Sequence, residues 1–335
     1  MNNRVTMADV AREAGVSLMT VSRVVNNKGE VSEATRQRIL KVIEKLGYRP
    51  SGIARSLATS RTGTIGLIVP DISNPFFADL AKGVEKVAYS EGYNVFLCST
   101  EENPQRELKV LESLAEYRVD GVLLCSSRLD EEHLVNSLGF FYSAVLVNRA
   151  LERRDLAVGT VMVDDVRGGE IATLHLINEG RKRIGFLAGP ETSHSGRNRF
   201  KGYRTALDQA GIPYDPEVVL HCASNVEGGY EAAKTLLSKN SDVTALFCYN
   251  DLVAVGALRA CNEMGVKVPD DVSVVGFDDI MLAGLVTPGL TTCRIQREEL
   301  GERSATMLLE QMGGCSGHCE TVVLVPELVV RESAP

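Results

Sequence analysis

The spacing of hydrophobic residues along the chain changes near residue 63. Before this point apolar residues recur every three or four positions, a period that predicts short amphipathic helices. After it, short apolar runs rich in Val, Ile and Leu alternate with amphipathic stretches of helical length. Runs of this kind predict buried strands. The pattern therefore indicates a small all-α head followed by a larger α/β region.

Polar residues and one glycine mark the helix ends in the head. Thr6 stands three positions before Asp9, which predicts a capping box, and Gly15 predicts the end of this first helix. Ser17 is a suitable cap for the next helix. Two short helices joined by a tight turn over residues 7–27 form a helix-turn-helix pattern. In that motif the second helix lies in the DNA major groove.

The larger region alternates strands and helices from residue 64 onward. Predicted strands include TIGLIVP, NVFLCS, DGVLLCS, SAVLVN, GTVMVD, RIGFLAG, EVVLHC, TALFCYN and VSVVGFD. Predicted helices lie near 75–91, 104–117, 165–180, 196–211, 226–239 and 250–265. This alternation predicts doubly wound parallel sheets, and two units of similar length predict two such subdomains. Ligands in this architecture bind beyond the carboxyl ends of the strands.

Charge separates the two regions further. Residues 1–62 contain 11 Lys and Arg against 5 Asp and Glu, a net charge of +6. The rest of the chain contains 25 against 39, a net charge of −14. A small basic head on an acidic body indicates that only the head binds a polyanion such as DNA.

Several classes of protein are disfavoured. No stretch reaches the roughly 20 apolar residues of a membrane span, and the first residues lack the apolar segment of a secretory signal. Most of the eight cysteines stand singly within apolar runs, which is typical of free thiols in a reducing cytoplasm. We therefore expect a cytoplasmic, nucleoid-associated protein with no membrane partner.

Neither a metal site nor an enzyme active site stands out. Cys315, His318 and Cys319 in CSGHC are possible metal ligands, but a second ligand pair at structural-zinc spacing is missing, so we expect no metal. The sequence has neither the phosphate-binding loop nor the glycine pattern of nucleotide cofactors. A nucleophile–base–orienter set is also missing. We expect no cofactor and no catalytic residues.

The second helix of the head carries side chains suited to DNA. Arg23 is long enough to reach the O6 and N7 atoms of guanine, while Leu18 and Met19 are apolar residues at the tip of the helix. Short hydroxyl side chains suited to phosphates are Ser17, Thr20 and Ser22. The alternative is an ordinary three-helix bundle with a solvated face, which does not account for two outward-facing apolar residues beside a lone arginine.

The amino-terminal sequence from VTMADVAREAGVSLMTVSRVVNN through ARSLATSRTGTIGLIVPDISNPFF resembles the signature of the lac repressor/galactose repressor family. The similarity continues through DGVLL, GRKRIGFLAGP, GYRTAL, DDVSVVGFDD and PGLTT, so it covers essentially the whole chain. It implies a dimeric transcriptional regulator, usually a repressor, in which a small-molecule effector controls binding to a pseudo-palindromic operator. It also implies that the two subdomains are of periplasmic-binding-protein type.

The resemblance assigns roles to residues of the head. Leu18, Met19 and Arg23 match base-reading positions of the recognition helix. Positions that contact the DNA backbone match Thr6, Ser17, Thr20, Ser22 and Asn26. Leu57 matches a hinge-helix leucine that family members insert into the minor groove. Such an apolar wedge unstacks a base step and kinks the duplex. The alternative for Leu57 is packing within the linker.

The resemblance also implies a sugar-type effector site in the strand-end loops. Its matching positions are Asn74, Phe76, Phe77, Asn148, Arg149, Ser193, Ser195, Arg199, Asn250 and Asp278. The two phenylalanines can stack on a sugar ring, and the polar groups can bind vicinal hydroxyls. The structural alternative is helix capping, which Asn74 and Asp278 could both provide.

Two departures from the family pattern affect the expected ligand. Ile295 replaces a glutamine near the cleft, which removes a polar group. His194, beside the pocket arginine, could bind an acidic sugar or could simply be part of the loop. Ser193 and Ser195 stand where the purine-responsive regulator carries larger donors, so a nucleobase is disfavoured. The alternatives that stay open are a sugar-binding module without DNA regulation and a regulator that responds to a sugar acid, a sugar phosphate or a purine.

The predicted organisation has four parts. Residues 1–50 form the DNA-binding domain, and 51–62 form the hinge helix and linker. The effector subdomains comprise 63–162 with 293–323 and 163–292 with 324–335. The expected partners are double-stranded operator DNA, a small-molecule effector and a second copy of the chain. The end of the sequence, PELVVRESAP, has no leucine heptads, so we expect a dimer and no tetramer-forming bundle.

Overall fold

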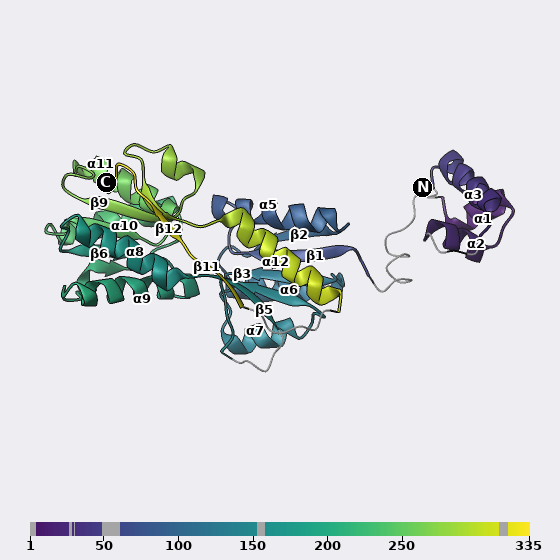
Figure 1. Cartoon of the computed structure of the whole chain (residues 1–335), viewed down its shortest axis with the longest axis horizontal. Helices are drawn as coiled ribbons and strands as arrows, with labels where there is room; N and C mark the ends of the chain where they lie inside the picture. Colours follow the sequence, from purple (N-terminus) through teal and green to yellow (C-terminus); the bar gives the residue numbers. More distant parts are fainter. Residues whose placement is uncertain (1–4, 27–28, 30, 49–60, 153–157, 315–320) are drawn as a thin grey trace. The chain divides into compact units, whose positions relative to one another are not determined.

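The computed structural model describes residues 5–26, 29, 31–48, 61–152, 158–314 and 321–335. The chain forms two compact units, residues 1–63 and 64–335, and each is described by itself (Figure 1). None of the described helices is both long enough and apolar enough to span a membrane. The described residues contain no group of three potential metal ligands, and Cys315, His318 and Cys319 lie outside them.

The described part of the first unit contains three helices with well-defined ends. They are α1 (Met7–Ala14), α2 (Leu18–Val25) and α3 (Glu33–Leu46). Thr6 and Asp9 form the predicted capping box, and Gly15 ends α1 in a left-handed conformation with φ 61°. The Ser17 hydroxyl accepts a hydrogen bond from the backbone N–H of Thr20 at 3.1 Å. The predicted helix-turn-helix is confirmed.

One small core holds these helices together. Its buried residues are Val10, Ala11, Ala14, Val21, Val24, Ile39 and Tyr48. They come from all three helices and the residues just after α3. Because Val21 and Val24 face inward, the opposite face of α2 is left exposed. Packing therefore determines which face of α2 is available to a partner.

Two six-stranded sheets form the second unit, counted over the described part of the chain. The first has the order β11-β5-β4-β3-β1-β2. Its strands are β1 (Thr64–Val69), β2 (Asn94–Ser99), β3 (Gly121–Cys125), β4 (Ala144–Val147), β5 (Gly159–Val163) and β11 (Thr321–Leu324). The printed strand pairs of this sheet are all parallel. Strand β2 forms one edge.

The second sheet has the order β12-β10-β9-β8-β6-β7. Its strands are β6 (Ile184–Leu187), β7 (Val219–Leu220), β8 (Ala245–Cys248), β9 (Ser273–Asp278), β10 (Thr291–Arg294) and β12 (Glu327–Val329). Only β12 pairs antiparallel, with β10, among the described strand pairs. The chain passes between the two sheets three times, after β5, after β10 and after β11. The predicted doubly wound architecture is confirmed.

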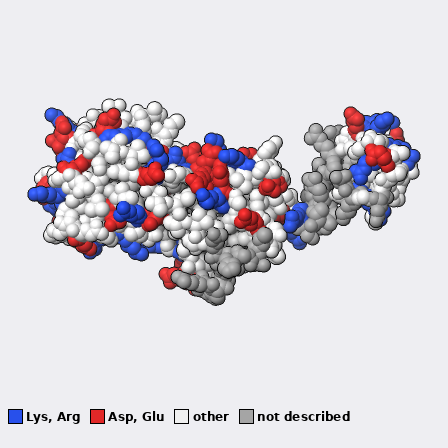
Figure 2. All heavy atoms as spheres, viewed as in Figure 1, with Lys and Arg blue, Asp and Glu red and all other residues white. Residues whose placement is uncertain are grey.

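Helices cover both faces of each sheet (Figure 1). Those of the first sheet are α5 (Pro75–Ser90), α6 (Pro104–Glu116), α7 (Glu131–Leu138) and α12 (Arg297–Met312). Those of the second sheet are α8 (Asp165–Asn178), α9 (His194–Gln209), α10 (Val226–Lys239) and α11 (Asp251–Met264). Acidic residues near the start of α12 gather on one face of the molecule (Figure 2). They include Glu298, Glu299 and Glu302, consistent with the acidic composition of this region.

Glycines let paired helices approach closely. A Cβ atom at Gly83 of α5 would lie 2.0 Å from the carbonyl oxygen of Glu298 in α12. A Cβ atom at Gly301 of α12 would lie 2.1 Å from the carbonyl oxygen of Leu80. Both distances are far below van der Waals contact, so α5 and α12 pack backbone to backbone. This contact fixes the start of α5, where the candidate site begins.

The strand predicted over EVVLHC is shorter than expected. Residues Pro216–Val218 form a 3₁₀ turn, and only Val219–Leu220 pair as β7. The Asp215 carboxylate accepts a hydrogen bond from the backbone N–H of Glu217 at 2.9 Å, which stabilises the turn. Proline at the first position of the turn adds to this preference. Local capping therefore replaces the first half of the predicted strand.

Candidate functional site

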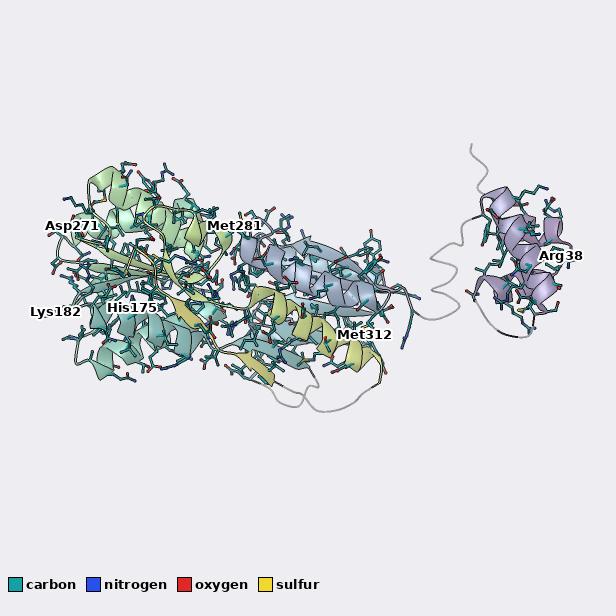
Figure 3. All side chains as sticks on the ribbon, turned by 45° about the horizontal axis from the view of Figure 1, so that its top comes forward. Arg38, His175, Lys182, Asp271, Met281 and Met312 are labelled. Atoms are coloured by element: carbon teal, nitrogen blue, oxygen red, sulfur yellow. The ribbon has the colours of Figure 1, made fainter. Side chains whose placement is uncertain are left out.

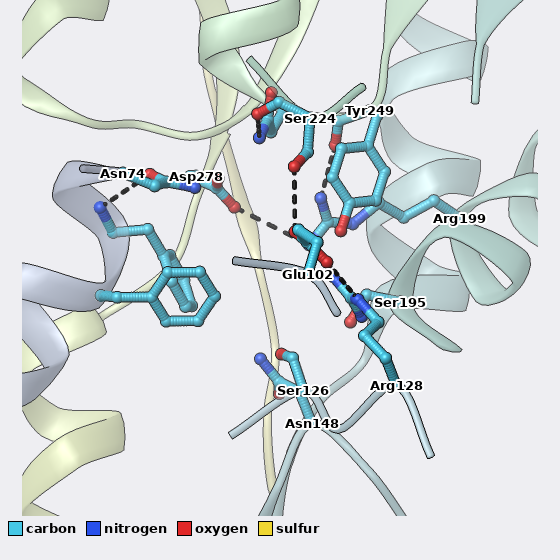
Figure 4. A pocket seen from close by; sticks show the side chains of 13 residues that line it. Asn74, Glu102, Ser126, Arg128, Asn148, Ser195, Arg199, Ser224, Tyr249 and Asp278 are labelled. Carbon is cyan, nitrogen blue, oxygen red and sulfur yellow. Dashed lines mark hydrogen bonds and ion pairs between the residues drawn. The ribbon is translucent and has the colours of Figure 1, made fainter. Parts of the chain in front are cut away.

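A small cavity of about 30 Å³ lies where the carboxyl ends of both sheets meet (Figure 4). It is lined by Asn74, Phe76, Phe77, Glu102, Ser126, Arg128, Asn148, Ser195, Arg199, Ser224, Tyr249, Asn250 and Asp278. Eight of the ten predicted effector residues are among these. Arg149 and Ser193 are not. In this arrangement the cavity is well below the roughly 300–1,000 Å³ of sites that hold a small molecule.

Asparagines hold the loop backbones in place around the cavity. The Asn74 Oδ1 accepts from the N–H of Phe76 at 3.0 Å, and the Asn250 Oδ1 accepts from the N–H of Val253 at 2.8 Å. The Asn148 Oδ1 accepts from the N–H of Val163 at 3.0 Å. The capping role considered for Asn74 is therefore present. It uses the amide oxygen and leaves the amide nitrogen facing the cavity region.

Arg199 forms the charged floor of the cavity. Its Nε donates to Asp165 at 2.8 Å, its Nη1 donates to the carbonyl of Tyr249, and its Nη2 lies 3.7 Å from an Asp278 oxygen. The guanidinium also stacks over the Phe277 ring, 3.6 Å from the centroid. Burial raises the pKa of Asp278, although the neighbouring Arg199 opposes the shift. The Asp278 carboxyl group therefore lines the cavity and is protonated more easily than an exposed aspartate.

Glu102 and Arg128 form a second charged pair that the sequence analysis missed. The Arg128 Nε donates to Glu102, and the Ser224 hydroxyl donates to the other Glu102 oxygen at 2.9 Å (Figure 4). Glu102 lies after β2 and Arg128 after β3, both at strand carboxyl ends. The same applies to Tyr249, after β8. The strand-end rule would have identified all three.

Arg149 and Ser193 lie beside the cavity and bind protein groups. The Arg149 Nη1 donates to the Ala150 carbonyl and to His194 Nδ1, both at 3.1 Å. The Ser193 hydroxyl caps α9 through the N–H of Gly196 and lies 3.0 Å from the Tyr249 hydroxyl. In this structure both predicted residues therefore bond to protein groups beside the cavity and do not line it.

His194 is neutral in this position. Burial, followed by the positive charges of Arg149 and Arg197, lowers the pKa of His194 to about 3. A neutral ring matches its hydrogen bond, since Nδ1 accepts from the Arg149 guanidinium. Ile295 is buried in the hydrophobic core and adds no polar group to the cavity.

In the first unit, α2 exposes the predicted base-reading residues. Leu18 and Met19 are 53% and 66% exposed, and Arg23 is exposed as well. The predicted backbone-contacting positions also take part in local bonds: Thr6 and Ser17 cap helices, Thr20 bonds to Ser17, and Ser22 accepts from Asn26 at 3.2 Å. Leu57 lies outside the described residues.

A helix-turn-helix unit followed by a two-lobed α/β unit with a cavity between its sheets defines a class. It is the class of DNA-binding proteins that a small molecule regulates. The comparisons with known proteins agree. The family model for bacterial regulatory proteins of the lacI family matches residues 6–51. The model for periplasmic binding proteins and the sugar binding domain of the LacI family matches residues 62–326.

Relatives match over nearly the full length. The HTH-type transcriptional regulator DegA of Bacillus subtilis (strain 168) is 37% identical over 333 residues, covering 98% of both chains. The HTH-type transcriptional repressor PurR of Mannheimia succiniciproducens is 36% identical over 329 residues, with the same coverage. The chain belongs to the lacI family, and it is a DNA-binding transcriptional regulator with an effector-binding domain and not an enzyme.

Solved structures show the same fold. A complex of the transcriptional regulator CelR with cellobiose superposes with a TM-score of 0.75 at 34% identity, covering 98% of this chain and 100% of that one. The lac repressor dimer bound to operator and the anti-inducer ONPF gives a TM-score of 0.88 at 27% identity, covering 99% of each chain.

The exposed arginine of α2 generates the first prediction. Replacing Arg23 with alanine should weaken binding to the preferred operator by about 1–3 kcal/mol and relax selectivity at one base pair, if the guanidinium reads a guanine. Binding of the purified protein to operators chosen from a random DNA pool measures this. Arg12→Ala removes another exposed positive charge, from α1, and serves as the control. Equal losses on every DNA sequence would show that Arg23 contacts only phosphate.

The depressed pKa of His194 generates the second prediction. Because the folded state keeps this ring neutral below its usual pKa of 6.5, the unfolded state binds the extra proton. Stability is therefore present above pH 6.5 and is lost as the pH falls toward 3. His194→Gln keeps an acceptor for Arg149 and should flatten this loss in urea melts between pH 7 and 5. The variant His133→Gln, on exposed α7, should not. Identical acid limbs in all three proteins would contradict the assignment.

Proposed function

We propose that the chain is a homodimeric repressor whose affinity for a pseudo-palindromic operator is controlled by a sugar or sugar derivative in the cavity. The observation that carries the proposal is the composition of the cavity. It combines three buried aromatic residues with amides, hydroxyls and two arginines, drawn from both sheets and from the helices that follow their strands. Sites for polyhydroxylated rings need this combination of an apolar wall and converging donors and acceptors.

The aromatic wall comes from the start of α5. The rings of Phe76 and Phe77 lie edge to face, with centroids 5.0 Å apart at 87°. This arrangement leaves one ring face and one ring edge for a ligand. A sugar presents C–H groups on one side and hydroxyls around its rim. The hydroxyls would then meet Asn74, Asn148 and Asn250. The CelR complex with cellobiose supports this choice of ligand class.

The position of the cavity supports control by population shift. Each sheet contributes lining residues, so a ligand that binds both halves favours one relative arrangement of the halves. Coupling of roughly 1–3 kcal/mol to the head is enough for useful regulation. We propose that residues 51–62 form the hinge that transmits the change, and that Leu57 is the wedge in the operator. The protein would act on the chromosome in the cytoplasm.

An apolar surface on the second unit supports the dimer. Its first part lies on the edge strand β2 and the helices beside it, with exposed Tyr89, Phe96, Leu97 and Tyr117. Its second part lies after β9, with exposed Met281 and Leu285 (Figure 3). An edge strand with exposed apolar side chains needs a cover to remain soluble. A second copy of the chain would supply this cover, and the similar lac repressor is a dimer in its operator-bound structure.

The edge strand generates a prediction for the assembly. Phe96 is 46% exposed on β2, and Phe140 is 58% exposed after α7. Phe96→Asp should convert the dimer to a monomer and abolish tight operator binding, because one head then meets only one half-site. Phe140→Asp is the matched control and should stay dimeric. Sedimentation equilibrium measures both masses. A dimeric Phe96→Asp protein would exclude this edge as the interface.

The regulatory proposal is tested by ligand and operator together. The purified protein is screened by thermal shift with pentoses, hexoses, disaccharides, sugar acids, sugar phosphates and purines. A ligand at 100 times its dissociation constant should add about 2.7 kcal/mol of stability. We expect a hit among sugars or their derivatives to change operator affinity tenfold or more, equivalent to about 1.4 kcal/mol.

Each other result selects an alternative. A hit only among purines would replace the sugar by a nucleobase. A sugar that binds without changing operator affinity would leave a sugar-binding module uncoupled from DNA. Asn148→Ala should weaken the hit, because this side chain lines the cavity. Asn136→Ala, on α7 outside the cavity, is the control. Equal effects of the two variants would place the ligand elsewhere.

A further inference from the structure

The cavity contains an ion pair, between Arg128 and Glu102, that binding of a neutral sugar does not require. The Arg128 side chain is 2% exposed, whereas the Glu102 side chain that pairs with it is 25% exposed. Both residues line the cavity. Burying a guanidinium is costly unless an anion stays beside it. Glu102 supplies that anion in this structure, and an anionic group of a ligand could supply it instead.

Arg128 is held rigidly from behind. Its backbone N–H donates to the buried Glu107 carboxylate of α6 at 2.9 Å, and the neighbouring Ser127 hydroxyl donates to the same carboxylate. Burial raises the pKa of Glu107, and the bond from Ser127 opposes the shift. These bonds fix the loop after β3. The backbone of Arg128 is therefore held beside the cavity whichever anion is paired with its guanidinium.

Glu102 is attached differently. It stands on an irregular turn in which Glu101 and Glu102 both have left-handed backbone angles, φ 53° and 57°. Its side chain reaches across the cavity, where the other oxygen accepts a hydrogen bond from Ser224 of the second half at 2.9 Å. Its carboxylate thus touches both halves at once, as a bound ligand would. Because a quarter of the Glu102 side chain is exposed, its carboxylate can turn outward and be solvated by water.

Further groups on the same side of the cavity favour an anion. Four cations, Arg149, Arg197, Arg128 and Lys201, act with burial to keep His194 neutral. The adjacent Ser195 is buried and lines the cavity, and its hydroxyl has no hydrogen-bond partner within the described part of the chain. Buried hydroxyls are normally satisfied, so this one points to a group that the ligand brings.

We propose that Glu102 is an internal substitute for the acid group of the effector. The effector is a sugar derivative with a carboxylate or phosphate, which takes the place of Glu102 on Arg128 and bonds to Ser195. This inference rests on the proposed sugar site and narrows its ligand. A neutral sugar replaces Glu102 poorly, because it would remove the carboxylate bonded to the buried guanidinium and bring no charge in exchange. An anionic group can, and it forms charge-assisted hydrogen bonds of the same kind.

The exchange also has a regulatory consequence. When Glu102 leaves Arg128, its bond to Ser224 breaks as well. The contact between the halves that Glu102 makes is then replaced by contacts through the ligand. Acid binding and rearrangement of the halves are therefore the same event.

The test compares acids with matched neutral sugars by calorimetry on the full-length protein. The probes are D-galacturonate and D-gluconate as carboxylates, glucose 6-phosphate and galactose 6-phosphate as phosphates, and D-galactose and methyl galacturonate as neutral partners. We expect at least one acid to bind about tenfold or more tighter than its neutral partner. The carboxylate and phosphate arms show which acid group the site takes.

Glu102→Gln is the decisive variant, because it removes the internal competitor. The acid should bind this variant about tenfold tighter than it binds the wild type, while neutral sugars change little. Glu101→Gln is the control: its carboxylate belongs to the same turn but pairs with Arg106 and does not line the cavity. Arg128→Gln should lose the preference for acids. If Arg128→Gln does not fold, the double variant Glu102→Gln/Arg128→Gln, which removes both charges of the pair, is used to measure the loss of acid preference.

The outcomes separate this inference from the proposed function. Neutral sugars that bind as tightly as acids and alter operator affinity would overturn the inference and leave the sugar-controlled regulator standing. Weaker acid binding to Glu102→Gln would also overturn it, since Glu102 would then assist the ligand. If neither acids nor neutral sugars bind any of these proteins, the inference and the sugar effector fall together.

Discussion

The buried guanidinium of Arg199 is the constraint on which the candidate site depends. A cation that is almost completely buried must be paired, and Arg199 finds its partners on three separate elements. Asp165 comes from the start of α8, the Tyr249 carbonyl from the end of β8, and Asp278 from the end of β9. Satisfying one side chain therefore brings together the loops of the second half. The floor of the cavity is the result.

The two units carry net charges of opposite sign. The head carries a net positive charge and exposes one arginine between apolar residues on α2, which suits a groove in a polyanion. The larger unit is strongly acidic overall, yet its cavity contains two buried arginines. Carboxylates of Glu102, Asp165 and Asp278 pair with these arginines, so the charges in the cavity are balanced. The acidic composition of the larger unit disfavours non-specific contact with DNA.

Local signals predicted much of the fold. Thr6, Asp9, Gly15 and Ser17 form caps through bonds to residues at most four positions away, so they were readable one segment at a time. The parallel sheets were also readable, because strands buried on both faces are apolar throughout. Most of the candidate site followed from the same rule, since parallel sheets gather ligands at strand carboxyl ends. Predicting strands from apolar runs failed at the start of β7, because a capped turn forms over Pro216–Val218 in place of the strand.

What the sequence by itself determined was the set of elements, the family and the strand-end loops that could line a site. Tertiary structure alone decided how the charges in those loops are paired. Glu102, Arg128 and Ser224 lie far apart along the chain, and only the facing of the two sheets joins them. The same packing turned Arg149 toward His194 and away from the cavity lining. The physical reason is that an ion pair depends on distance and burial in space, which neighbours in sequence do not specify.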